Sequence, residues 1–191
     1  MALIRIAAPA SEPLDLATAK LHCRVDGTDD DALITALIVA AREQAEHETG
    51  RAMVTQTWEL VHDAFPSAFV LRKAPIQSVT SIKYLDSTSG IEQTLDPADY
   101  LLDNASEPGY VVPGYGKAWP ASFAVPNAVR CRYVCGYGNA AAVPQAIKQW
   151  MLLAVGTMYA QRETAIVGQI ASIPDRFWSG LLDPYRLYEA G

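Results

Sequence analysis

Residues 143–162 read VPQAIKQWMLLAVGTMYAQR, and their apolar side chains recur with the period of an α-helix. Pro144 suits the first turn of this helix, because its missing N–H would have no partner there. One face carries Ile147, Met151, Ala154, Val155 and Met158. Trp150 adds an apolar group on the flank of that face. A helix that is apolar most of the way round is typical of a central helix packed on several sides.

Two further helices are predicted in the first 50 residues. Asp15 is a good N-cap for a short helix over residues 16–23, whose inner face carries Leu16, Ala19 and Cys23. A second, amphipathic helix follows the acidic run of residues 29–31 and ends where Gly50 can take the left-handed C′ conformation. We interpret the acidic run as a helix start rather than a cation site, because the EF-hand spacing is absent.

The period changes to that of β-strands at residue 53. Strands are expected at residues 55–62, 69–71, 79–85, 91–95, 100–102, 110–112 and 128–135. The fold class predicted is α+β, mainly α: a small helical bundle with an antiparallel β segment inserted between the second and third long helical stretches. We expect one connector-like domain with a helical core over residues 1–52 and 143–191 and a β-rich insertion over residues 53–142.

The last part of the chain is expected to finish the helical core. Residues 164–172 are small and contain a glycine, so we expect a mobile connection there. A last short helix is expected from Ile173, with Phe177, Leu181 and Leu182 facing inward.

Composition limits the classes of function. Half of the 191 residues are hydrophobic, which indicates a folded chain, and the formal net charge is -6. A protein that grips DNA by its phosphates should be basic, whereas an acidic wall would let DNA pass without sticking. Three cysteines without a C-x-x-C pair argue against a disulfide framework and fit a reducing compartment. We expect neither a signal peptide nor a membrane span, since the apolar run after Lys148 is shorter than the roughly 20 residues a bilayer requires.

Two patterns that resemble chemical sites are rejected on their spacing. His22 and Cys23 with Cys131 and Cys135 do not follow any standard zinc spacing, so we interpret the cysteines as core residues. The run at residues 136–141, GYGNAA, is a degenerate dinucleotide fingerprint that lacks the second strand of a βαβ unit. Its glycines more simply let the chain turn from strand to helix.

No catalytic, cofactor-binding or metal-ligating residue is predicted. His22, His47 and His62 are the only histidines, and none adjoins a nucleophile-elbow sequence. The aromatic residues Trp58, Tyr115, Trp119 and Tyr137 lack the interleaved basic residues of a single-strand-binding platform. Two interpretations of these aromatics stay open: contacts with another protein, or packing within this one.

The order of several short motifs resembles the head–tail connector (adaptor) proteins of long-tailed bacteriophages. In the first half these are Pro13-Leu14-Asp15-Leu16, Ala19-Lys20, His22-Cys23-Arg24-Val25-Asp26, Asp30-Asp31-Ala32-Leu33-Ile34, Ala41-Arg42-Glu43, Thr49-Gly50-Arg51 and Gln56-Thr57-Trp58-Glu59-Leu60. In the second half they are Ser78-Val79-Thr80-Ser81-Ile82, Tyr115-Gly116 before Trp119-Pro120, Gly136-Tyr137-Gly138, Val143-Pro144 before Ile147-Lys148, and Pro184-Tyr185-Arg186. Each piece is ordinary alone, and their order over nearly the whole chain makes the resemblance specific.

The resemblance implies a structural role in the virion. Such a protein would form a ring beneath the portal at the head–tail junction, extend the DNA channel and dock the next head-completion (stopper) or tail protein. It implies no enzyme activity, no cofactor, no specific DNA binding and no membrane. During assembly the protein, encoded by a phage or a prophage, would be in the host cytoplasm. The shorter family members lack much of the β segment.

Two alternatives remain beside the adaptor: a β-rich protein-binding module on a helical base, and a small enzyme with an unrecognised site. The polar face of the helix at residues 31–49 carries Arg42, Glu43, Glu46, His47 and Glu48. We interpret it as a solvated face and as a candidate for contacts between subunits. Normal ring formation after reversal of both Arg42 and Glu46 would contradict the subunit-contact hypothesis.

Overall fold

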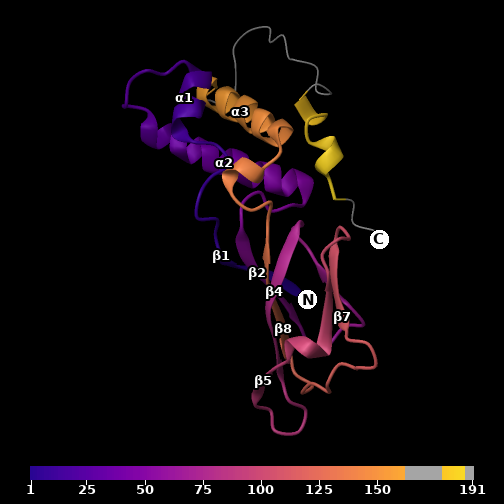
Figure 1. Cartoon of the computed structure of the whole chain (residues 1–191). Helices are drawn as coiled ribbons and strands as arrows, with labels where there is room; N and C mark the ends of the chain where they lie inside the picture. The colour runs from indigo at the N-terminus through magenta and orange to yellow at the C-terminus, as the bar shows by residue number, and fades with distance from the viewer. Residues whose placement is uncertain (162–177, 188–191) are drawn as a thin grey trace. The chain divides into compact units, whose positions relative to one another are not determined.

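The computed structural model describes residues 1–161 and 178–187 and shows a mixed α+β protein (Figure 1). The helices are α1 (Leu16–Cys23), α2 (Asp31–Thr49) and α3 (Gln145–Ala160), with short 3-10 turns η1 (Pro97–Asp99), η2 (Ala140–Ala142) and η3 (Asp183–Tyr185). The strands are β1 (Ala2–Ala7), β2 (Gln56–His62), β3 (Phe69–Leu71), β4 (Ile76–Leu85), β5 (Glu92–Thr94), β6 (Tyr100–Asp103), β7 (Gly109–Pro113) and β8 (Val129–Cys135). The predicted α+β class is confirmed.

The chain divides into two compact units. A β unit comprises Met1–Ala10 and Thr55–Gly136, and a helical unit comprises Ser11–Val54 and Tyr137–Gly191. The first ten residues lie with the strands because β1 pairs with β2 in antiparallel register, from Ala2 opposite Val61 to Ala7 opposite Thr57. The boundaries therefore differ from those drawn on the sequence, and the description as one connector domain stays a prediction.

The start of α1 follows from one side chain. Asp15 is its N-cap and accepts a hydrogen bond from the backbone N–H of Thr18 at 2.6 Å, which lowers the pKa of this carboxyl group. Ala19 is completely buried, and Leu16 and Cys23 pack at the edge of the core. The predicted helix, its cap and its inner face are confirmed.

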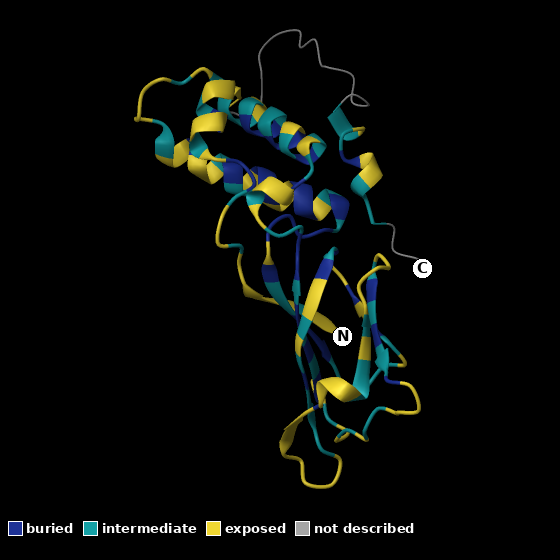
Figure 2. Ribbon diagram, in the orientation of Figure 1, coloured by how far each residue is buried: buried dark blue, intermediate teal, exposed yellow. Residues whose placement is uncertain are grey.

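Helices α2 and α3 form the main contact of the helical unit. Ile34, Ile38, Ala41 and Ala45 line the buried side of α2, and Gly50 ends the helix with φ +72°, which requires the freedom of glycine. In Figure 2 buried residues alternate with exposed ones along α2, as expected for a helix with one side in the core.

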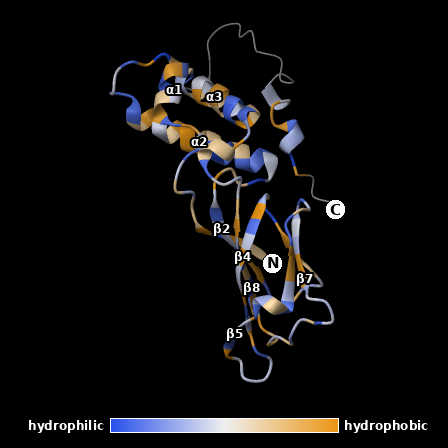
Figure 3. Ribbon diagram, viewed as in Figure 1, coloured by the Kyte–Doolittle hydropathy of each residue, from blue (hydrophilic) through white to orange (hydrophobic). Residues whose placement is uncertain are grey.

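The buried face of α3 follows the predicted spacing. Ile147, Trp150, Met151, Ala154 and Val155 are all buried. Figure 3 shows hydrophilic residues near the start of α3 and apolar residues along much of the rest. Pro144 occupies the N-cap position, one residue before the helix. The Trp150 ring lies 5.1 Å from that of Trp178. None of the described helices combines the length and apolar character needed to cross a membrane.

The β unit consists of two sheets. A five-stranded sheet has the order β1-β2-β8-β4-β5, and a three-stranded sheet has the order β3-β7-β6. The hairpin predicted around residues 87–90 is confirmed, since β4 and β5 pair antiparallel with Leu85 opposite Glu92.

The inner faces of the two sheets pack together through aromatic and aliphatic side chains. Phe69 is completely buried, with its ring 5.6 Å from His62 and 5.5 Å from Trp119. Tyr133 of the larger sheet donates its hydroxyl to the backbone oxygen of Arg72 at 2.9 Å. Gly109 is required for close packing, because a Cβ there would lie 2.8 Å from Cγ1 of Ile76.

The end of the chain returns to the helical unit. Leu182 is completely buried in the helical core, with Leu181 packed at its edge, as predicted. The predicted connection at residues 164–172 and the start of the last helix at residues 173–177 lie outside the described residues.

Candidate functional site

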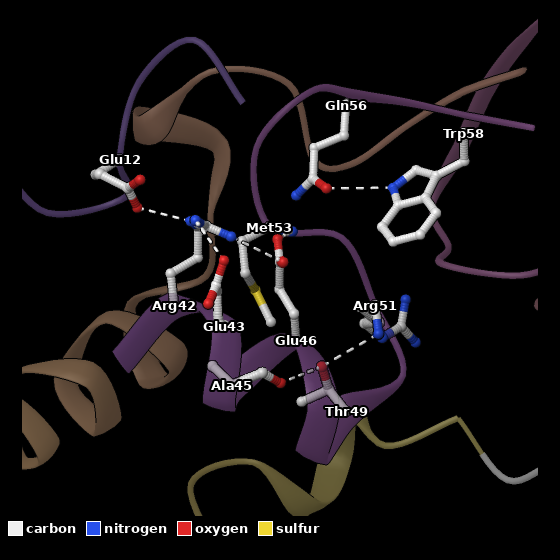
Figure 4. Close-up of polar contacts among 10 residues, drawn as sticks. All are labelled: Glu12, Arg42, Glu43, Ala45, Glu46, Thr49, Arg51, Met53, Gln56 and Trp58. Carbon is white, nitrogen blue, oxygen red and sulfur yellow. Dashed lines mark hydrogen bonds and ion pairs between the residues drawn. The ribbon is translucent and has the colours of Figure 1, made fainter. Parts of the chain in front are cut away.

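An ion-pair network around the buried Arg42 lies on α2 (Figure 4). Arg42 Nε donates to Glu12 Oε2 at 2.7 Å, and Arg42 Nη1 donates to Glu46 Oε2 at 3.0 Å. Glu46 Oε1 in turn accepts the backbone N–H of Met53 at 3.0 Å. The network thus connects the segment before α1, the middle of α2 and the chain that follows α2.

The electrostatics of Arg42 are those of a paired buried charge. Burial alone would lower the pKa of Arg42, but the hydrogen bond to Glu12 and the charge of Glu46 raise it above the ordinary value. The guanidinium group is planar and carries several N–H donors that point in different directions. It can therefore bind two carboxylates at once in a fixed geometry, for which the ammonium group of lysine is less suited.

This network corrects the interpretation of the polar face of α2. Only 3% of Arg42 and 6% of Glu46 are exposed, so these two residues are not part of a solvated surface. Glu43 and His47 are exposed, as expected for that face. Arg42 and Glu46 are four residues apart, a spacing that also forms ion pairs on exposed helix surfaces. The sequence of the helix therefore cannot show that Glu12 covers this pair. Reversing both charges would disrupt the folded unit, so that variant cannot test subunit contacts.

A second set of polar contacts fixes the end of α2. Thr49 donates its hydroxyl to the carbonyl of Ala45 at 2.7 Å. Arg51 Nε donates to the carbonyl of Tyr185 at 2.6 Å, and the N–H of Leu187 donates to the carbonyl of Thr49 at 2.9 Å. These bonds attach residues 185–187 to the α2 terminus and place the C-terminal segment in the helical unit.

The cysteine and histidine residues do not form one site. His22 and Cys23 belong to the helical unit, whereas Cys131 and Cys135 belong to the β unit. Residues 1–161 and 178–187 contain no group of three His, Cys, Asp or Glu side chains that would hold a metal ion. Cys131 and Cys135 are fully buried on the face of β8 that also carries Tyr133, so their interpretation as core residues is confirmed.

We predict that the three thiols differ sharply in reactivity. Burial raises the pKa of Cys131 to about 12, so this thiol stays protonated and unreactive at pH 8. Cys135 is equally buried and therefore inaccessible to the reagent. Cys23 is only partly buried and is expected to react first, although burial also raises its pKa. Mass spectrometry after alkylation should find one modified cysteine in the native protein and three in denaturant. Equal alkylation of Cys131 and Cys23 in the native protein would contradict the burial of the Cys131 side chain on β8.

The acidic run lies at the start of α2, as predicted, but Asp30 at the N-cap position makes no side-chain hydrogen bond to the helix backbone. Asp31 is the first residue of α2, and its carboxylate binds Lys20 Nζ at 2.5 Å. Asp30 accepts a hydrogen bond from the hydroxyl of Tyr159 on α3. These contacts join the start of α2 to α1 and α3.

The glycines after β8 serve the turn into the helical unit. Gly136 and Gly138 have φ values of +114° and +112°, and Asn139 then caps η2 by accepting the N–H groups of Ala141 and Ala142. This confirms the interpretation of residues 136–141 as a turn.

The four aromatic residues singled out from the sequence have different roles. Trp119 stacks on Phe65 with ring centroids 5.2 Å apart, and Trp58 donates Nε1 to Gln56 Oε1 at 3.2 Å. Tyr137 packs against the helical core. Tyr115 differs from all of these, because its side chain is 101% exposed. Trp58, Trp119 and Tyr137 are half-buried and make contacts within the chain, whereas Tyr115 is fully exposed.

The outer faces of the two sheets also differ in chemistry. The outer face of the five-stranded sheet carries ion pairs of Arg132 with Glu59 at 2.8 Å and of Lys83 with Glu92 at 2.9 Å; Arg130 also pairs with Glu92. The outer face of the three-stranded sheet carries Val70 and Leu101, 42% and 56% exposed. Sequence reasoning did not find this apolar face, because each of its strands is only three to five residues long.

Comparison with known proteins gives one family match over part of the chain and several matches to solved structures. Residues 13–93 match the family model described as Phage gp6-like head-tail connector protein. No curated protein matches the chain.

Solved structures match over the full length. A chain from the neck of an empty gene transfer agent (GTA) particle, computed with C6 symmetry, has a TM-score of 0.81 and 21% identity, covering 100% of this chain and 98% of that chain. Chains from the virion of a native GTA particle and from a native GTA neck computed with C12 symmetry have TM-scores of 0.80 and 0.77, both at 22% identity and the same coverage.

These matches confirm the resemblance to head–tail connectors that the sequence motifs indicated. At such low identity the structural matches establish a shared fold, and the family match adds a likeness to connectors over residues 13–93. Together they support a connector role and a structural rather than an enzymatic protein.

Proposed function

We propose that this chain, which resembles head–tail connectors, assembles as a ring beneath the portal of a DNA-filled head. The ring extends the DNA channel and presents a docking surface to the next head-completion or tail protein. In this proposal the protein is in the host cytoplasm during assembly and at the head–tail junction in the finished particle.

The observation that carries the proposal is the full-length correspondence with a neck chain. The match covers 100% of this chain and 98% of the other at a TM-score of 0.81, so it includes both the helical and the β unit. The neck structures computed with C6 and C12 symmetry support an arrangement of repeated copies around an axis.

The charge of the chain supports passage of DNA without binding. The net charge of -6 opposes the phosphate contacts on which non-specific DNA affinity depends. A ring of acidic copies would therefore repel the phosphate backbone and leave DNA free to slide.

A protein-binding module in the β unit is the second candidate function. The β unit is compact and has its own buried aromatic cluster, and Tyr115 projects fully from it. This is compatible with the adaptor role, because an adaptor must also bind its neighbours. The small-enzyme alternative has no comparable observation in its favour.

The test adds the purified protein to DNA-filled heads arrested before tail joining. Electron microscopy is expected to show a ring below the portal, and heads that lack the portal serve as the control. Empty portal vertices at saturating protein would defeat the adaptor proposal.

A further inference from the structure

The first half of α2 is apolar all round, although one side of it faces solvent. Residues 32–41 read ALITALIVAA, in which Thr35 is the only polar residue. Ile34 and Ile38 take one side of this segment into the core. The opposite side is exposed and carries four apolar residues, which we name the α2 face: Ala32, Leu33, Ala36 and Ala40. Because a helix that is apolar all round is typical of a buried helix, we expect another surface to cover the α2 face.

Helix α1 carries a second exposed apolar surface. Leu21 is 81% exposed, on the side of α1 opposite to the completely buried Ala19. Among the described residues of the helical unit, Leu21 and Leu33 are the exposed large apolar side chains. They lie on different helices, and Figure 2 shows exposed residues on both. One copy of the helical unit therefore presents two separate apolar surfaces.

The charges next to the α2 face are mainly negative. One cation, Arg42, lies among three carboxylates: Glu12 at 2.7 Å, Glu46 at 3.0 Å and Glu43 at 3.6 Å. These four side chains together have a formal charge of -2, from one guanidinium and three carboxylates. Glu43 is the most distant from Arg42, is 52% exposed, and follows Ala40 on the same side of α2. An additional cation beside Glu43 would be stabilised there.

Arg24 places an exposed cation beside Leu21. It is the C-cap residue of α1, and its side chain makes no ion pair within the described parts of the chain. Its backbone adopts the left-handed conformation with φ +58°, which costs free energy in a residue other than glycine. Residues kept in such a conformation often have a functional side chain, so Arg24 is a candidate for a contact outside its own copy.

We propose that the α2 face of one copy packs against the outer side of α1 in the next copy, where Leu21 covers the apolar residues and Arg24 lies beside Glu43. The inference rests on the proposed ring and names one of its subunit contacts. A ring requires a head-to-tail contact, which joins two different surfaces of the chain. Helices α1 and α2 each provide one of these surfaces.

The spacing along the two helices agrees with this contact. Leu21 precedes Arg24 by three residues, and Ala40 precedes Glu43 by three residues. With the two helices side by side and parallel, Leu21 lies against the small side chain of Ala40 while Arg24 reaches the level of Glu43. The antiparallel arrangement would instead bring Asp15, the N-cap of α1, towards Glu43, and the two carboxylates would repel each other.

A second copy is a better occupant of the α2 face than a separable partner. Interfaces between identical subunits are more apolar than those of partners that also exist apart. The chain itself carries the complementary surface, since Leu21 is apolar and Arg24 has the charge opposite to that of Glu43. Arginine is also among the residues that contribute most to binding when they are desolvated.

Cysteine cross-linking in assembled rings tests the contact. The chain carries Cys23→Ser, which removes the one thiol that is partly exposed. Addition of Leu21→Cys and Ala40→Cys, followed by a short bismaleimide on portal-bearing heads, should give a ladder of covalent oligomers. An equal mixture of the two single variants should give dimers only, because each link then joins one copy of each kind. Both positions are exposed, so the fold should tolerate the changes.

A matched pair sets the background. Leu21→Cys with Gln149→Cys places the second thiol at an exposed position of α3, outside the proposed contact. A ladder from the first pair with background linking from this pair supports the proposal.

Exchange of the two charges tests the polar part of the contact. Arg24→Glu alone and Glu43→Lys alone should each reduce the fraction of portal vertices that carry a ring, whereas the chain with both changes should recover it. Far-ultraviolet circular dichroism checks that each variant is folded. Full ring formation by both single variants would overturn the pairing of Arg24 with Glu43.

Four results would overturn the contact as a whole or its occupant. Rings seen by electron microscopy with only background linking would reject this interface while leaving the adaptor function intact. Dimers from Ala40→Cys alone would indicate a two-fold contact between α2 faces. Links from Ala40→Cys to a different protein of the particle would assign the α2 face to that protein. Absence of rings from the unmodified chain would reject the adaptor function and, with it, this inference.

Discussion

Replacement of Arg42 by alanine is expected to destabilise the helical unit strongly. The guanidinium is nearly inaccessible, and its loss would leave the carboxylates of Glu12 and Glu46 next to each other without a cation. Breaking a buried pair by removing one partner typically costs about 3–5 kcal/mol of unfolding free energy. Against a typical domain stability of about 5–15 kcal/mol, such a loss would bring many proteins close to unfolding.

Urea unfolding followed by far-ultraviolet circular dichroism measures this effect. Glu43→Ala is the matched control, because that carboxylate is half-exposed and lies 3.6 Å from Arg42. It should change the stability by less than about 1 kcal/mol. Glu46→Gln keeps an oxygen that can accept the Met53 N–H, so its effect should lie between those of the other two variants. Equal effects of Arg42→Ala and Glu43→Ala would show that the network is not buried in solution.

Replacement of Trp150 by alanine is expected to have a comparably large effect through packing. Only 1% of Trp150 is exposed, and its ring contacts that of Trp178. Truncation of a buried tryptophan removes its transfer free energy and leaves a cavity, which together cost about 3–5 kcal/mol. Leu21→Ala on α1 is expected to leave the free energy of unfolding almost unchanged, because the Leu21 side chain is 81% exposed.

Hydrogen exchange can locate the effect of Trp150→Ala within the chain. Because each unit has its own core, amide protection should fall most in the helices and least in the strands around Phe69. Unchanged protection of α2 and α3 in the Trp150 variant would contradict the central role assigned to α3. The Leu21→Ala variant should keep the exchange pattern of the parent chain.

The two predictions concern structures that an adaptor needs. An adaptor has no substrate to select, so its function depends on surfaces held in fixed geometry by buried groups. Arg42 fixes the segments before and after α2, and Trp150 holds the helices together. Loss of either is therefore expected to abolish ring formation through loss of the fold rather than through loss of an interface.

Local sequence was sufficient to predict the elements whose signals are short-range. The spacing of Ile147, Met151 and Val155 predicted the buried face of α3, and Asp15 predicted the start of α1. Alternation along β8 predicted that Cys131 and Cys135 are core residues. Period and capping depend only on neighbours within a few residues, so they can be read from the chain itself.

Tertiary structure alone decided which surfaces are covered. Arg42 and Glu46 have the spacing of an exposed helical pair, and only the arrival of Glu12 and Met53 buries them. Likewise, β1 joins the β unit because it pairs with the edge of β2, which lies far along the chain. The apolar outer face of the three-stranded sheet exists because β3, β6 and β7 pair in one register. Burial and strand register depend on contacts between segments that are distant in the chain. The free energy of those contacts cannot be predicted from a local sequence pattern.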